Sequence, residues 1–195
     1  MITSTPALDR AMVWNLPNTL TWLRIAAIPL IVLLFFMPYP WSDPAAGLLF
    51  AAAGVTDSLD GYFARRLGQT SRLGAFLDPV ADKLIVAVAL VLLISKDTRA
   101  LIVLTAAVII GREITISALR EWMAEMGARR KVAVSQLGKI KTVLQIVGLS
   151  MMLYRASLLG LPIYRIGVAL TEIAAAATLV SMVDYLRAAW PELRR

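Results

Sequence analysis

The stretch TDSLDGYFARRLGQTSRLGAFLDPVADK, residues 56–83, decides the fold of this chain. Its four aspartates are Asp57, Asp60, Asp78 and Asp82. The first two are three residues apart and the last two are four apart, so each pair occupies one face of a helix. Long apolar runs flank both pairs. Because carboxylates next to hydrocarbon are costly, the pattern predicts two membrane helices that carry a functional site.

The composition extends this prediction to the whole chain. Of the 195 residues, 59% are hydrophobic and only 17% are charged, against roughly a quarter in a soluble domain. A soluble protein of this size could not bury that much apolar surface. We therefore expect an integral membrane protein in a lipid bilayer, and we expect no nucleic-acid partner. The net charge of +7 suits anionic headgroups and substrates, although the usual excess of Lys and Arg on cytoplasmic loops explains most of it.

The absence of histidine and cysteine narrows the chemistry. It excludes disulfides, thiolate nucleophiles, zinc sites of the usual kind and Ser-His-Asp triads. Any proton transfer therefore falls to carboxylates, lysine or tyrosine.

The apolar runs predict an all-α membrane protein with six transmembrane helices. They cover about residues 18–37, 44–67, 74–95, 99–119, 137–159 and 164–186. Residues 1–16 form an N-terminal interfacial segment, in which residues 6–15 are either a short helix or a frayed terminus. We expect one domain over residues 1–195. Lys and Arg concentrate on one side of these spans, which predicts that both termini lie in the cytoplasm.

Four carboxylates that converge in a medium of low dielectric constant repel one another strongly. Hard oxygen ligands select Mg²⁺, Ca²⁺ or Mn²⁺, and two such ions about 3.5–4 Å apart form a clamp for phosphoryl chemistry. The alternative is a set of salt bridges from the aspartates to Arg65, Arg66 and Lys83.

The same stretch follows the pattern D-x-x-D-G-x-x-A-R-x8-G-x-x-x-D-x-x-x-D. Its fixed positions are Asp57, Asp60, Gly61, Ala64, Arg65, Gly74, Asp78 and Asp82. In every fixed residue and spacing this resembles the signature of the CDP-alcohol phosphotransferases. The resemblance implies an enzyme that transfers a CDP-activated phosphoryl group to an alcohol and releases CMP.

The resemblance also implies roles for single residues. Asp57, Asp60 and Asp78 would bind two metal ions, either Mg²⁺ or Mn²⁺. Asp82 would be both a metal ligand and the catalytic base that deprotonates the attacking hydroxyl. The positions that contact the nucleotide part of CDP-diacylglycerol in the family correspond to Asn18, Thr21, Asp57, Gly61, Arg65 and Ser71. For Asn18 and Thr21, in the segment PNTLT, helix capping is the alternative.

Four cationic residues at the inner ends of the fourth and fifth predicted spans could hold a phosphate on the acceptor alcohol. They are Arg112, Arg120, Lys139 and Lys141. Arg112 lies about 20 Å along its span, where an unpaired Arg is expensive; an ion pair with Glu113, or snorkelling, is the alternative. The two lysines face nearly opposite directions on a helix, so we expect only one to reach the pocket.

The segments GREITISALRE, residues 111–121, and GKIKT, residues 138–142, resemble bacterial members of the family whose acceptor is glycerol 3-phosphate. This implies transfer of a phosphatidyl group from CDP-diacylglycerol to glycerol 3-phosphate by a homodimer in the bacterial cytoplasmic (inner) membrane. Phosphatidylglycerol, inositol phosphate and serine remain alternative acceptors, because the same aspartates serve all of them. Outside the family, the alternative is a small cation transporter. Glu172 has no assigned function, and we expect it to make a polar contact between helices.

Overall fold

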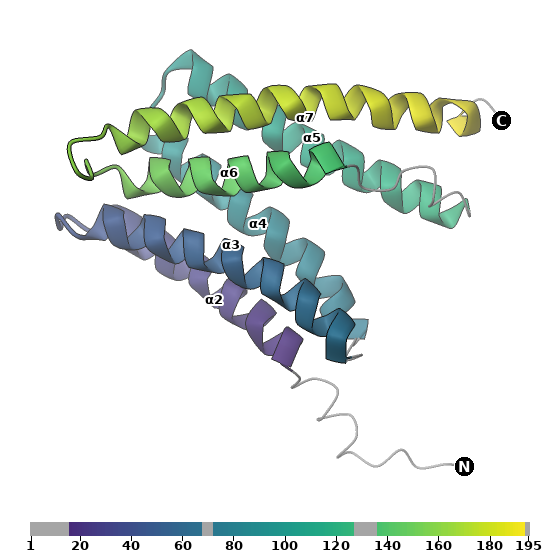
Figure 1. Ribbon diagram of the computed structural model, residues 1–195, viewed down its shortest axis with the longest axis horizontal. Helices are drawn as coiled ribbons and strands as arrows, with labels where there is room; N and C mark the ends of the chain where they lie inside the picture. The colour runs from purple at the N-terminus through teal and green to yellow at the C-terminus, as the bar shows by residue number, and fades with distance from the viewer. Residues whose placement is uncertain (1–15, 68–71, 127–135, 194–195) are drawn as a thin grey trace, which may run out of the picture. The chain divides into compact units, whose positions relative to one another are not determined.

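The computed structural model describes residues 16–67, 72–126 and 136–193, and these residues form six helices and no β-strand (Figure 1). The helices are α2 (Leu16–Phe36), α3 (Ser42–Leu67), α4 (Arg72–Lys96), α5 (Ala100–Glu125), α6 (Gln136–Tyr154) and α7 (Ile163–Leu193). The predicted all-α fold with six long helices is therefore confirmed. The interfacial helix expected within residues 6–15 lies outside the described residues.

Three stretches of the described helices are long and apolar enough to cross a membrane: Asn18–Phe36, Ala100–Glu125 and Ile163–Arg187. Large apolar side chains on these helices, such as Leu23, are exposed, as expected where lipid covers them. The protein is therefore a multi-pass membrane protein. That α3, α4 and α6 also cross the membrane stays a prediction. In α3 and α4 the aspartates interrupt the apolar sequence, and the apolar part of α6 is the shorter stretch Ile140–Tyr154.

The chain folds as two compact units, the first ending at Ala89 and the second beginning at Leu90, so α4 runs from one into the other. The single domain expected over residues 1–195 stays a prediction. In the first unit α2 packs along α3 (Figure 1). The turn between them is closed by Ser42, whose Oγ donates to the carbonyl oxygens of Met37 at 2.9 Å and Tyr39 at 2.7 Å.

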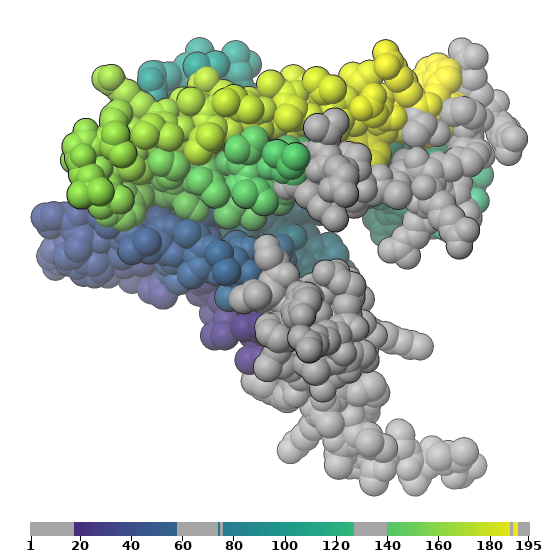
Figure 2. Space-filling model, in the orientation of Figure 1, coloured from purple at the N-terminus to yellow at the C-terminus, as the bar shows by residue number. Residues whose placement is uncertain are grey.

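In the second unit α6 and α7 lie side by side and in close contact (Figures 1 and 2). Their backbones approach closely where Gly148 faces Gly167. A Cβ added to Gly148 would lie 2.9 Å from the carbonyl oxygen of Gly167, and one added to Gly167 would lie 2.7 Å from that of Gly148. Small residues allow this approach, which is a common way for membrane helices to pack.

Helix α6, which corresponds to the fifth predicted span, ends earlier than predicted, at Tyr154 rather than near residue 159. Arg155, Leu159 and Gly160 all have positive φ, at 55°, 53° and 78°, and this left-handed backbone cannot continue a right-handed helix. The apolar residues of this turn read as helix in the sequence because hydropathy does not report backbone conformation.

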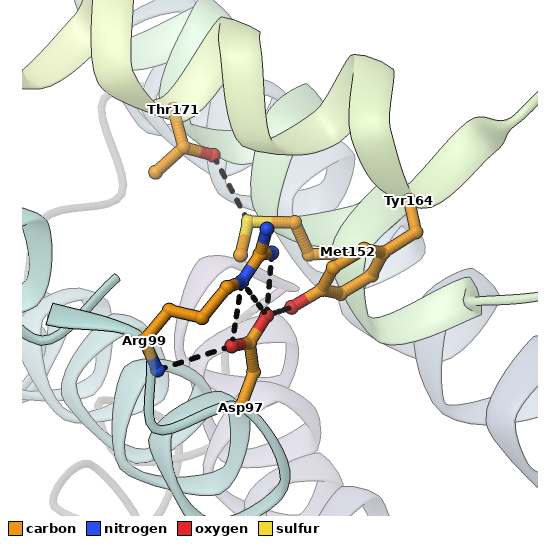
Figure 3. A network of polar contacts seen from close by, with 5 residues as sticks. All are labelled: Asp97, Arg99, Met152, Tyr164 and Thr171. Carbon is orange, nitrogen blue, oxygen red and sulfur yellow. Dashed lines mark hydrogen bonds and ion pairs between the residues drawn. The ribbon is translucent and has the colours of Figure 1, made fainter. Parts of the chain in front are cut away.

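A polar network ties the turn between α4 and α5 to the start of α7 (Figure 3). Arg99 Nη2 lies 2.7 Å from Asp97 Oδ2, and its Nε lies 2.9 Å from Oδ1. The Tyr164 hydroxyl donates to Asp97 Oδ2 at 2.5 Å, and the Arg155 guanidinium lies 5.4 Å from the centre of the Tyr164 ring. The donors from Arg99, then that from Tyr164, hold the pKa of Asp97 well below its usual range, so the network is built around a charged carboxylate.

Candidate active site

One face of α2 begins with three polar residues. Asn18, Thr21 and Arg24 follow one another at three-residue spacing and are 2%, 0% and 2% exposed, whereas the neighbouring Trp22 and Leu23 are exposed. Residues at this spacing share a helix face. Asn18 and Thr21 lie within α2 rather than before it, so the alternative that they cap the helix does not describe their position.

This face of α2 holds aspartates of α3 and α4. Arg24 Nη1 lies 2.8 Å from Asp57 Oδ1 and 3.2 Å from Asp82 Oδ1, and the Thr21 hydroxyl donates to Asp78 Oδ1. The structure therefore brings three of the four predicted metal-binding aspartates to α2. Three carboxylates near one guanidinium leave a local excess of negative charge.

The structure describes the other predicted nucleotide- and metal-binding residues only in part. Asp60, Gly61 and Arg65 lie on α3, but their side-chain surroundings are outside the described residues. Ser71 falls between the described ranges, as do all the residues that join α3 to α4. The roles assigned to these four residues stay predictions.

The aspartates fit a divalent cation by the chemistry of their donors. Carboxylate oxygens are the ligands that Mg²⁺ and Mn²⁺ prefer. A bound cation would also neutralise the excess negative charge around Arg24. Among the side chains that the structure describes, no three acidic groups form a ligand set. Asp60 is not one of these side chains, and Arg24 takes an oxygen of both Asp57 and Asp82.

A second polar group lies in the other unit, where α5 and α6 carry buried cations. Arg112 is 8% exposed and Lys141 is 5% exposed, and the charges that act most on Lys141 are those of Arg112, Glu113 and Arg120. Arg112 pairs with Glu113, as the alternative for this residue anticipated. Three cations still face one acid, so the group retains a net positive charge that suits a phosphate.

Lys141 is the lysine that the structure places in this cationic group. Its Nζ has no hydrogen-bonding partner among the described residues. The side chain of Lys139 lies outside the described part of the chain. Arg120 also donates from Nη2 to the Tyr185 hydroxyl at 2.9 Å and lies 5.2 Å above the Tyr185 ring. Tyr185 therefore holds Arg120 in place.

Sequence reasoning missed two contributors to these sites. Arg24 was assigned no role from the sequence, although its three-residue spacing from Thr21 places both on one helix face. Tyr185 gave no comparable signal, because it is 65 residues from Arg120 in the sequence. Glu172 has a buried Oε1 without a hydrogen-bonding partner among the described residues, so the contact between helices expected for it stays a prediction.

Comparison with known proteins decides the family. The family model described as CDP-alcohol phosphatidyltransferase matches residues 14–183, a range that includes all four aspartates and the cationic group. The chain belongs to this family. It is therefore a transferase, as its signature predicted, and the alternative of a cation transporter has no support.

Curated relatives of this family member cover nearly its full length. Proteins from Escherichia coli (strain K12) and Shigella flexneri serotype 5b (strain 8401) are both 50% identical to it over 182 residues, which is 93% of this chain and 98% of each relative. Both relatives are named CDP-diacylglycerol–glycerol-3-phosphate 3-phosphatidyltransferase.

Proposed function

We propose that the protein transfers the phosphatidyl group of CDP-diacylglycerol to glycerol 3-phosphate, giving phosphatidylglycerophosphate and CMP. One observation carries this proposal: relatives named for this reaction are 50% identical over 93% of the chain. The aspartate signature alone would not choose the acceptor, since it serves every alcohol that the family uses. The buried cationic group on α5 and α6 agrees with an acceptor that carries a phosphate.

The predicted metal ligands would hold Mg²⁺ or Mn²⁺, and their carboxylate oxygens are numerous enough to bind two ions. These ligands are Asp57, Asp60, Asp78 and Asp82. When bound, the ions supply positive charge that stabilises the diphosphate and the departing CMP.

In the proposed reaction Asp82 takes the proton from the 1-hydroxyl of glycerol 3-phosphate while that oxygen attacks the β-phosphorus of CDP-diacylglycerol. The bond between the β-phosphorus and the bridging oxygen breaks, and CMP leaves with the bonding electrons. The Asp82 side chain is 50% exposed, so an incoming hydroxyl can reach it. Arg24 holds Asp82 Oδ1 at 3.2 Å and so orients the carboxylate.

The two substrates would be held by different groups. The nucleotide part of CDP-diacylglycerol would contact Asn18, Thr21, Asp57, Gly61, Arg65 and Ser71, of which Asn18 and Thr21 lie on the buried polar face of α2. The phosphate of the acceptor would bind to Arg112, Arg120, Lys139 and Lys141. A guanidinium can donate two parallel hydrogen bonds to a phosphate, which fixes its orientation.

The proposed location is the bacterial cytoplasmic (inner) membrane, with both termini in the cytoplasm and two copies forming a homodimer. The distribution of Lys and Arg supports the orientation. Because the chain has no cysteine, one cysteine added at each terminus in turn tests it directly. A membrane-impermeant thiol reagent should label neither terminus in intact cells and both after lysis. Crosslinking of the purified protein in lipid tests for the dimer.

The acceptor is tested by CMP release from detergent-purified protein with CDP-diacylglycerol, Mg²⁺ and one acceptor at a time. Release with glycerol 3-phosphate alone supports the proposal. Release with phosphatidylglycerol, serine or inositol phosphate instead would keep the transferase and overturn the acceptor assignment.

A further inference from the structure

We propose that Arg24 competes with the divalent cation for the carboxylates of Asp57 and Asp82, and thereby sets how tightly the aspartate cluster binds that cation. The inference rests on the proposed metal site. Arg24 lies outside the aspartate signature, and its proposed role is to position the carboxylates of Asp57 and Asp82 in the first unit.

The geometry that supports this inference centres on one nitrogen atom. Arg24 Nη1 lies 2.8 Å from Asp57 Oδ1 on α3 and 3.2 Å from Asp82 Oδ1 on α4. A cation bound by the first and fourth aspartates must contact the same carboxylates. The guanidinium and the metal therefore share their ligands, and binding of one weakens the contacts of the other.

Arg24 cannot avoid this competition by moving into water. The residue is 2% exposed, and it lies between Thr21 and the apolar residues Ala27 and Ile28, which continue the buried face of α2. Its positive charge therefore stays beside the carboxylates whichever oxygens it contacts.

The size of the effect follows from the closeness of the charges. A charge within about 4–6 Å of a carboxylate changes its affinity for a proton about 10- to 1,000-fold. A divalent ion carries twice the charge of a proton, so removing Arg24 should raise cation affinity by at least about tenfold.

The same contacts give Arg24 a stabilising role. It offsets the repulsion among Asp57, Asp78 and Asp82 and so holds α3 and α4 to α2. A purely structural Arg24 would have only this role. The two roles differ in one observable, because a structural residue should leave cation affinity unchanged or lower it when removed, whereas a competitor should raise it.

The experiment compares four purified proteins in detergent: the natural sequence, Arg24→Gln, Arg24→Lys and the control Arg165→Gln. Arg165 is an exposed arginine in the first turn of α7, so its substitution removes the same charge from a residue of the second unit that is not part of the aspartate cluster. Mn²⁺ binding is measured from the electron paramagnetic resonance signal of free Mn²⁺. The melting temperature of each protein is measured in EDTA and in saturating Mg²⁺.

Arg24→Gln should bind Mn²⁺ at least about tenfold more tightly than the natural protein. It should melt at a lower temperature in EDTA, yet gain more from Mg²⁺, because tighter binding to the folded state stabilises it further. Arg24→Lys, which keeps the charge, and Arg165→Gln should both bind Mn²⁺ within about threefold of the natural protein. If Arg24→Gln does not fold, Arg24→Met takes its place, because it also removes the charge and should likewise bind Mn²⁺ at least about tenfold more tightly than the natural protein.

Two failures are distinguishable. If the natural protein binds no Mn²⁺, the proposed metal site is wrong and the inference falls with it. If the natural protein binds Mn²⁺ but Arg24→Gln binds it no more tightly, the metal site stands and Arg24 is only structural. An equal gain in affinity from Arg165→Gln would also overturn the inference, because the effect would then follow net charge.

Discussion

Gly148 offers a sharp test of how α6 and α7 are held together. The substitution Gly148→Ala would place a Cβ 2.9 Å from both the carbonyl oxygen of Gly167 and the backbone nitrogen of Thr171. The nearest atom, Thr171 Oγ1, belongs to a side chain, but the other two are backbone atoms of a long helix and cannot rotate away. The two helices must separate, which loosens contacts along their length.

The expected loss follows from the known effect of overpacking. Extra methyl groups in a packed interface destabilise by about 1–3 kcal/mol, and two rigid contacts place this substitution in the upper part of that range, about 2–3 kcal/mol. For a protein of this size each kcal/mol lowers the melting temperature by about 2–4 °C. We therefore expect Gly148→Ala to melt about 4–12 °C below the natural protein in detergent.

Gly111→Ala is the matched control, because a Cβ at Gly111 meets nothing within 4 Å. Gly111 lies inside α5, where Ala is the better helix former, so this variant should melt at or above the temperature of the natural protein. An unchanged melting temperature for Gly148→Ala, or an equal fall for Gly111→Ala, would refute the close approach of α6 to α7.

Two further predictions concern the second unit. Asp97→Asn should lower stability by about 1 kcal/mol at pH 7. Because the pKa of Asp97 is lowered in the folded protein, its contribution is complete above the unfolded value near 3.9 and is lost as the pH falls through the folded value. The difference in melting temperature between the two proteins should therefore stay constant from pH 8 to 5 and shrink below about pH 4; a constant difference down to pH 3 would contradict this. Lys141→Gln should raise the KM for glycerol 3-phosphate about tenfold or more with little change in the KM for CDP-diacylglycerol, and equal effects on both would contradict a role at the acceptor phosphate.

Much of the fold could be predicted because hydropathy and helix length are local properties of the sequence. The six helices lie where the apolar runs are, even where Pro29 and Pro79 fall inside α2 and α4. The end of α6 could not be predicted, since Arg155 adopts positive φ without being glycine. The network around Asp97 was also missed, because Tyr164 is 67 residues away in the sequence.

Some residues of the candidate site could likewise be predicted from the sequence, and others could not. The spacing of the aspartates identified them without any structure, because a signature is a local pattern. The contact of Arg24 with Asp57 and Asp82 joins three helices and depends on how they pack. From the sequence, Arg24 was therefore assigned no part in the site. The cations on α5 and α6 were predicted together as a phosphate pocket, whereas the burial of Arg112 and Lys141 and the charges that surround Lys141 depend on the fold.

The most direct test of the central claim, that the aspartate cluster carries out phosphatidyl transfer to glycerol 3-phosphate, is CMP release by Asp82→Asn beside the natural protein. Both are given CDP-diacylglycerol, glycerol 3-phosphate and Mg²⁺, and circular dichroism confirms equal helix content. We predict a loss of at least about a hundredfold in turnover, since general base catalysis contributes about 10²–10⁴-fold, with the fold intact. Near-normal turnover by a well-folded Asp82→Asn protein would contradict the assignment of Asp82 as the base.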